Sequence, residues 1–236
     1  MSQTKPKKKA HDDAKPAPKR AAPGSDPTRV VHAEFLAGAA PGGTLPPPTV
    51  VEIAFGGRSN VGKSSLINTL CDRRGLVRTS STPGSTRQVN LYDVRTADGA
   101  SMHLVDLPGY GFAKRSKVEA RSWGGLIEGY LSTRVTLAAL VLIVDVRRGL
   151  EDEERDLAEF LAQPSVVTRR TPSLLLVATK IDKLSKSERA PAIARIAADG
   201  RARAYGFSAE TGEGKTALWA AVRRAAFGED ALAPPA

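Results

Sequence analysis

Short apolar segments alternate with longer amphipathic segments along most of this chain. The short segments, rich in leucine and β-branched residues, predict strands at residues 50–56, 89–94, 101–106, 137–145, 173–179 and 203–207. Between them, apolar positions recur at helical spacing and predict helices near residues 63–71, 116–131, 151–162, 185–198 and 214–226. The alternation predicts an α/β domain of three layers, with helices flanking a six-stranded, mostly parallel sheet.

The connections refine this prediction. The turn at residues 97–99 separates the second and third strands, so we expect one of them to run antiparallel to the rest. The longest apolar run, residues 135–144, spans about ten residues, too few to cross a bilayer. We therefore expect no membrane span, and a ligand site at the carboxyl ends of the parallel strands.

The first 48 residues differ in composition from the rest. They hold most of the prolines, together with many lysines, alanines and glycines, and cannot bury enough apolar surface to offset the entropy of ordering. We expect a disordered basic extension at residues 1–48, and leave open whether its apolar patch at 30–36 docks on the domain. The domain is predicted at residues 49–228, followed by a tail at 229–236.

The chain is basic, with 35 Lys and Arg against 25 Asp and Glu and a pI near 9.9. Such a balance favours a polyanionic partner. The single cysteine, Cys71, excludes an internal disulfide and fits a reducing cytoplasm. We expect a cytoplasmic, monomeric protein that does not bind DNA.

A phosphate-binding loop follows the first predicted strand. The GxxxxGK[ST] pattern lies between a strand and a helix, as this motif requires, and consists of Gly57, Arg58, Ser59, Asn60, Val61, Gly62, Lys63 and Ser64. Backbone N–H groups and the start of the helix favour phosphate oxygens here. Lys63 is predicted to reach the β- and γ-phosphates, and the Ser64 hydroxyl to bind Mg²⁺.

The sequence Thr179-Lys180-Ile181-Asp182 follows another buried strand and predicts the choice of base. A carboxylate only accepts hydrogen bonds, whereas guanine offers two donors on one edge and adenine has an acceptor at N1. Asp182 therefore selects guanine, because adenine would leave the carboxylate unpaired. Lys180 is expected to lie along the base and to brace the phosphate loop.

Two loops are predicted to sense the γ-phosphate. In the second one, Asp106 would hold Mg²⁺ through water and the Gly109 amide would contact the γ-phosphate, in the turn Asp106-Leu107-Pro108-Gly109. The first switch is predicted at residues 78–88, where Thr86 is our choice of magnesium ligand and Thr82 and Thr79 are rivals. Its binding residues are taken as Gly84, Ser85, Thr86, Arg87 and Gln88.

A last nucleotide-binding element is predicted after the sixth strand. There the backbone amides of Phe207, Ser208 and Ala209 could meet the guanine O6.

With these elements in order, the chain resembles the EngB (YihA/YsxC) family of GTPases, within the TrmE-Era-EngA-YihA-Septin-like class. The resemblance covers roughly residues 49–225 and is strongest in 52–68 and 106–114, with further support from Tyr130-Leu131, Arg134 and 207–212. It implies a magnesium-dependent GTPase that assists assembly of the large ribosomal subunit in bacteria, with a link to cell division and septation.

The chain departs from the family pattern at two places. Ser85 stands where the family usually has Lys or Arg, and Arg87 lies two positions later. This leaves Thr86 as ligand but puts the surface contacts of the first switch in doubt. Ile181 replaces the usual alanine of the base motif, at a side chain not expected to touch the base.

The expected catalytic machinery lacks one part. Ras-like enzymes orient the attacking water with a glutamine in the second switch, whereas Tyr110 follows Gly109 here. We therefore expect slow hydrolysis of GTP to GDP and phosphate by Lys63, Thr86, Gly109 and Asn60. Asn60 matches an asparagine that binds K⁺ in related GTPases. The alternatives are that Asn60 only shapes the loop, or that Gln88 reaches the water.

Three functional classes are weighed. The leading one is a GTP switch that acts on ribosomal RNA and protein and is stimulated by K⁺, the ribosome or both. A GTPase of tRNA modification usually needs an added catalytic domain. An ATP-using phosphotransferase is opposed by Asp182.

Overall fold

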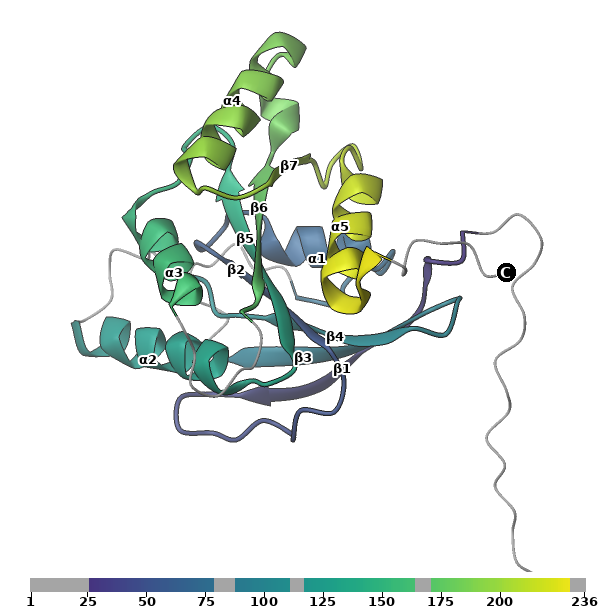
Figure 1. The fold of residues 1–236 in the computed structure, drawn as a ribbon, viewed down its shortest axis with the longest axis vertical. Helices are drawn as coiled ribbons and strands as arrows, with labels where there is room; N and C mark the ends of the chain where they lie inside the picture. Colours follow the sequence, from purple (N-terminus) through teal and green to yellow (C-terminus); the bar gives the residue numbers. More distant parts are fainter. Residues whose placement is uncertain (1–25, 79–87, 111–116, 164–170, 230–236) are drawn as a thin grey trace, which may run out of the picture.

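A twisted sheet forms the centre of the protein in a computed structural model, which describes residues 26–78, 88–110, 117–163 and 171–229, with backbone only for 117–124 (Figure 1). Within these ranges the sheet has seven strands in the order β1-β3-β4-β2-β5-β6-β7. Their bounds are Val30–Ala39, Glu52–Gly57, Val89–Thr96, Ser101–Asp106, Leu137–Asp145, Ser173–Thr179 and Ala204–Phe207 for β1 to β7. β3 pairs antiparallel with both β1 and β4, and the other four strand pairs are parallel, so the mostly parallel sheet is confirmed.

Strand β1 corrects the expected six-stranded sheet. It pairs with β3 antiparallel, with bulges between Val30 and His32 and between Phe35 and Ala37. Phe35 packs edge-on against buried Tyr92, with ring centroids 5.8 Å apart. The pairing begins inside the segment 1–48 that was expected to be disordered, because β3 supplies hydrogen bonds and a ring that compensate for the low apolar content of that segment.

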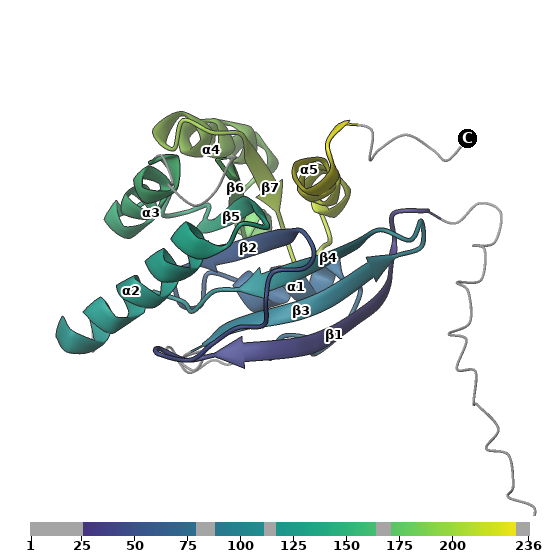
Figure 2. The ribbon, with the colours of Figure 1, turned by 60° about the horizontal axis from the view of Figure 1, so that its bottom comes forward.

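The helices cover both faces of the sheet. Apolar side chains of α1 (Lys63–Leu70) and α5 (Lys215–Phe227) pack on one face. The other face is covered by α2 (Lys117–Thr133), α3 (Asp152–Ala162) and α4 (Lys186–Asp199). Figure 2 shows the two helical layers on either side of the strands. The predicted three layers are therefore confirmed, with helix ends within two residues of those expected.

The central strands alternate strictly between the two cores. On β5, Val141 and Ile143 face the core of α1 and α5, whereas Leu140 and Leu142 face the core of the other helices. All four side chains are fully buried. A strand covered on both faces has to be apolar at every position, which explains the continuous hydrophobic runs in the sequence. Among the described residues, no helix has the length and apolar character needed to cross a membrane.

An ion pair braces the amino-terminal end of the parallel strands. The Glu52 carboxylate, fully buried at the start of β2, accepts hydrogen bonds from the Arg134 guanidinium and from the Tyr130 hydroxyl, the latter at 2.7 Å. Burial by itself raises the pKa of Glu52, but contacts with His103, Arg134 and Tyr130 outweigh it and lower the pKa to about 2. Glu52 therefore stays charged and joins β2 to the end of α2.

Candidate functional site

The loop between β2 and α1 has the shape of a phosphate cradle. Asn60 and Gly62 adopt positive φ values of 64° and 105°, and Gly62 is the N-cap of α1, without a side-chain cap. Positive φ at these positions turns successive N–H groups to one side, which makes an anion-binding concavity at the helix start. Val61 is buried and anchors the loop, whereas Asn60 is exposed.

Lys63 at the start of α1 pairs with Asp106 at the end of β4. The Nζ of Lys63 donates to Oδ1 of Asp106, and both side chains are buried. The other oxygen, Oδ2, is also buried and has no hydrogen-bond partner among the described residues. A buried carboxylate oxygen without a donor is costly, so Asp106 is suited to a further cationic or donor ligand.

The second switch begins in direct contact with the phosphate loop. The Ser59 N–H donates to the Tyr110 carbonyl at 2.9 Å. A Cβ at Gly109 would lie 3.1–3.2 Å from Ser59 atoms, so only glycine fits without displacement. Leu107, Pro108 and Gly109 are buried, which fixes the start of the loop. Residues 111–116 lie outside the described residues.

The base motif is held against the phosphate loop from the carboxyl end of β6. Thr179 donates its hydroxyl to the carbonyls of Val61 and Val144, at 2.8 and 2.9 Å. The ammonium group of Lys180 donates to the Asn60 carbonyl at 2.9 Å. The expectation that Lys180 braces the phosphate loop therefore agrees with the geometry.

Asp182 lies where β6 and β7 end side by side. The Ser208 hydroxyl donates to its Oδ1 at 2.7 Å, and Lys183 lies 3.0 Å from its Oδ2. The Ser208 hydrogen bond, followed by that of Lys183, lowers the pKa of Asp182, so the group is an anion and an acceptor at neutral pH. Phe207 and Ile181 are buried, whereas Ala209 is exposed.

Most of the predicted first switch lies outside the described residues. The predicted ligand Thr86 and its rivals Thr79 and Thr82 lie outside the described residues, as do Gly84, Ser85 and Arg87. Gln88 is described and exposed, just ahead of β3. Its side-chain oxygen lies so close to Gly38 that a Cβ there would be 2.9 Å away. Gln88 is therefore packed against β1.

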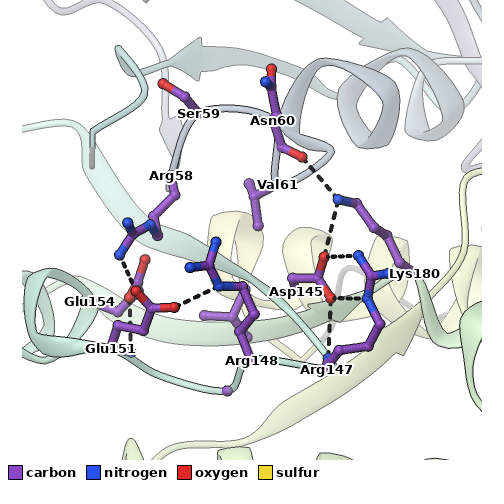
Figure 3. A pocket seen from close by; sticks show the side chains of 12 residues that line it. Arg58, Ser59, Asn60, Val61, Asp145, Arg147, Arg148, Glu151, Glu154 and Lys180 are labelled. Atoms are coloured by element: carbon purple, nitrogen blue, oxygen red, sulfur yellow. Dashed lines mark hydrogen bonds and ion pairs between the residues drawn. The ribbon is translucent and has the colours of Figure 1, made fainter. Parts of the chain in front are cut away.

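A cavity of about 240 Å³ opens between the phosphate loop, the turn after β5 and the start of α3 (Figure 3). Its charged lining includes residues that the motif search missed: Asp145, Arg147, Arg148, Glu151 and Glu154. One signal could have found Asp145. Like Asp106, it ends a buried parallel strand, at the sheet edge where ligands bind.

Glu154, in the first turn of α3, is a buried acid that lies close to Tyr110 and Arg58. Glu154 is only 1% exposed, and burial raises its pKa. Burial, with Glu154 nearby, also raises the pKa of Tyr110 well above its usual value. Arg58 pairs with Glu151 and, at 2.9 Å, with Glu153. Tyr110 is thus directed at α3, and its phenol stays neutral.

The residues present fit a magnesium ion. Ser64 offers a half-buried hydroxyl, and Asp106 offers the unpartnered Oδ2. Mg²⁺ prefers oxygen ligands, and it typically takes one or two from the protein and the rest from phosphates and water. The described part of the predicted ligand set therefore has suitable chemistry.

Comparisons with known proteins agree with this geometry. Residues 52–180 match the family model described as "50S ribosome-binding GTPase". The GTP-binding protein EngB of Geobacter metallireducens is 45% identical over 197 residues, covering 82% of this chain and 92% of the relative. EngB of an Anaeromyxobacter species is 42% identical over 216 residues, covering 88% and 97%. A crystal structure of a GTP-binding EngB protein matches with a TM-score of 0.57 at 22% identity, covering 74% of this chain and 98% of that one, which supports the fold.

Proposed function

Because this chain belongs to the EngB family of GTP-binding GTPases, we propose that it is a magnesium-dependent switch that assists assembly of the large ribosomal subunit. The observation that carries the nucleotide part is the contact between Lys180 and the Asn60 carbonyl. This contact joins the proposed base motif to the proposed phosphate loop, which supports the binding of one nucleotide across both.

Each site residue has a proposed role in this switch. The loop from Gly57 to Ser64 binds the phosphates, and Lys63 moves from Asp106 to the β- and γ-phosphates when GTP binds. Ser64, Thr86 and, through water, Asp106 hold Mg²⁺, which neutralises phosphate charge. Asp182 reads the guanine edge, and the amides of Phe207 to Ala209 face its O6. Residues 84–88 and 106–109 respond to the γ-phosphate.

Hydrolysis by the free protein is proposed to be slow. Tyr110 occupies the position after Gly109, where Ras-like enzymes carry the glutamine that orients the attacking water. Something else has to supply positioning or charge in the transition state. We propose K⁺ held by Asn60, the ribosome, or both.

Single-turnover hydrolysis tests the role of potassium. The rate is expected to be higher in K⁺ than in Na⁺ or Li⁺ at equal ionic strength, and Asn60→Ala is expected to remove the difference. Gln88→Ala is the matched control for the alternative water-positioning residue. Equal rates in all three salts, unchanged by Asn60→Ala, would exclude the potassium role and leave the GTPase assignment intact.

Charge and family support a ribosomal partner. The chain carries a net charge of +10, and Arg73, Arg74 and Arg78 are exposed after α1. Basic side chains that neutralise RNA phosphates give an association that weakens steeply with salt. We propose that the protein acts on the ribosomal RNA and protein of the large subunit in the bacterial cytoplasm, and that normal cell division and septation depend on this supply of ribosomes.

Co-sedimentation tests the ribosomal role. We expect the full chain to pellet with large-subunit particles in the presence of non-hydrolysable GTP, less so with GDP, and to be released by raised salt. Arg74→Glu should weaken pelleting, whereas the exposed Arg155→Glu, on α3, serves as the control. Equal pelleting with non-hydrolysable GTP and with GDP would count against a GTP-switched assembly factor.

Competition binding tests the nucleotide class. GTP and GDP are expected to displace a fluorescent guanine nucleotide at concentrations at which ATP has no effect. Displacement by ATP at similar concentrations would favour a phosphotransferase.

A further inference from the structure

Asp145, at the carboxyl end of β5, belongs to none of the sequence motifs, yet its carboxylate has several hydrogen-bond and ion-pair partners. Its Oδ1 accepts hydrogen bonds from the Arg147 backbone N–H at 3.1 Å and from Arg147 Nε at 2.9 Å. Its Oδ2 accepts from Arg147 Nη2 at 2.6 Å and lies 3.1 Å from Lys180 Nζ. Figure 3 shows the carboxylate between Lys180 and Arg147, on the wall of the cavity. The side chain is only 7% exposed.

Lys180 is the residue of the base motif that this arrangement constrains. Its ammonium group is shared between Asp145 and the Asn60 carbonyl, so it is held from two elements at once. Its backbone has a φ of +60°, a conformation that a lysine rarely adopts. Both the main chain and the end of the side chain are thus fixed at the junction of β6 and the phosphate loop.

A free lysine loses much rotamer entropy when it is immobilised on a ligand. A lysine that already lies in its bound position loses less, and binds the ligand more tightly for the same contacts. Asp145 is itself immobilised, because the planar guanidinium of Arg147 grips both oxygens. Arg147 therefore holds Asp145 in place, and Asp145 in turn holds Lys180.

We propose that Asp145 is a positioning residue for guanine-nucleotide binding, which holds the Lys180 ammonium in place for the base and the phosphate loop. It touches no substrate atom itself. This inference rests on the proposed role of Lys180 at the base and goes beyond the motif residues.

Calorimetric titration of GDP in Mg²⁺ tests the proposal in a double-mutant cycle. Asp145→Asn keeps the shape of the side chain, removes its charge, and is expected to raise the Kd for GDP about tenfold. Lys180→Met removes the ammonium group that Asp145 positions. In the double variant, the Asp145 change should then add less than about twofold to the Kd of Lys180→Met, because both act through one group.

Two further variants make the cycle decisive. Arg147→Ala removes the side chain that immobilises Asp145 but keeps the carboxylate beside Lys180, and should raise the Kd in the same direction as Asp145→Asn and by a smaller factor. Should Asp145→Asn fail to fold in a thermal melt, Asp145→Glu replaces it in the same cycle. It keeps the charge for Arg147 but displaces the carboxylate by one methylene.

The outcomes separate this proposal from the proposed function. Additive effects of the Asp145 and Lys180 changes, or an Asp145→Asn Kd equal to that of wild type, would overturn the positioning role. A wild-type protein without measurable GDP affinity, or a Lys180→Met variant that binds as wild type does, would instead overturn the proposed role of Lys180.

Discussion

A buried carboxylate lies near each end of strand β2, and the two carboxylates differ in whether both oxygens have hydrogen-bond partners. At its start, both oxygens of Glu52 are occupied by Arg134 and Tyr130. Beyond its carboxyl end, Lys63 pairs with Asp106, whose second oxygen has no hydrogen-bond partner among the described residues. A closed network stabilises the fold, whereas an open one can exchange partners with a ligand.

This difference suggests that one end of the strands serves stability and the other end serves ligand binding. Apart from Gln88, which precedes β3, the motif residues that the structure describes lie at or just beyond the carboxyl ends of β2, β4, β6 and β7. We therefore expect substitutions at the Glu52 end to lower stability without changing nucleotide affinity. Substitutions at the Lys63 end should weaken nucleotide binding or hydrolysis with little loss of stability.

The largest effect is expected for Arg134→Ala at the closed end. It leaves the buried Glu52 carboxylate without its counter-charge and should lower the free energy of unfolding by about 3–5 kcal/mol. Urea denaturation of the nucleotide-free protein measures this. The exposed pair of Arg155 and Asp152 gives the control, because Arg155→Ala should cost less than about 0.5 kcal/mol. A weakened GDP affinity in the folded Arg134→Ala protein would break the proposed separation.

At the open end, Lys63→Ala should reduce single-turnover GTP hydrolysis by about 10²–10³-fold, because one charge-stabilising group is lost from the transition state. The control is Lys215→Ala, which removes an ion pair with exposed Asp72 at the start of α5. Hydrolysis within a few-fold of wild type in Lys63→Ala would show that the loop is not the phosphate site.

Acid should remove the stabilisation that ionised Glu52 provides, and should do so in a defined pH range. The pKa of Glu52 is about 2 in the folded protein, below its ordinary 4.5. The unfolded chain therefore binds the extra proton first, and the stabilisation is complete above about pH 4.5 and lost as the pH falls toward 2. The loss amounts to about 3 kcal/mol. Denaturation curves of wild type and Glu52→Gln should converge across this range, and a constant gap would contradict the assignment.

The smallest effect is expected at Ser208, which donates to the Asp182 carboxylate that we propose reads the base. Ser208→Ala removes the 2.7 Å hydrogen bond to Asp182 and should weaken GDP binding about three- to tenfold. Ser185→Ala, at the exposed N-cap of α4, removes a hydroxyl from outside the site and should lower stability by about 1 kcal/mol without changing the GDP affinity. Equal GDP affinities in wild type and Ser208→Ala would place Asp182 outside the site.

The sequence predicted strands β2 to β7 but missed the edge strand β1. The apolar positions of β2 to β7 form patterns that are local in the sequence. Strand β1 is half exposed, lies in a proline-rich segment, and is stabilised by pairing with β3 more than fifty residues away, which no local pattern reveals. The candidate site likewise has parts that could be predicted from the sequence and parts that could not. The loop at 57–64 and the base motif at 179–182 are contiguous strings, whereas the contact between Asp145 and Lys180 forms only when β5 and β6 align.

The most direct test of the whole account compares the base preference of wild type and Asp182→Asn by calorimetric titration. Xanthine has a carbonyl where guanine has its exocyclic amine, so an asparagine amide can donate where the aspartate could only accept. We predict that wild type binds GDP strongly and xanthosine diphosphate weakly, and that Asp182→Asn reverses this order. A variant that still prefers GDP would contradict the assignment of this sheet edge as the guanine-nucleotide site.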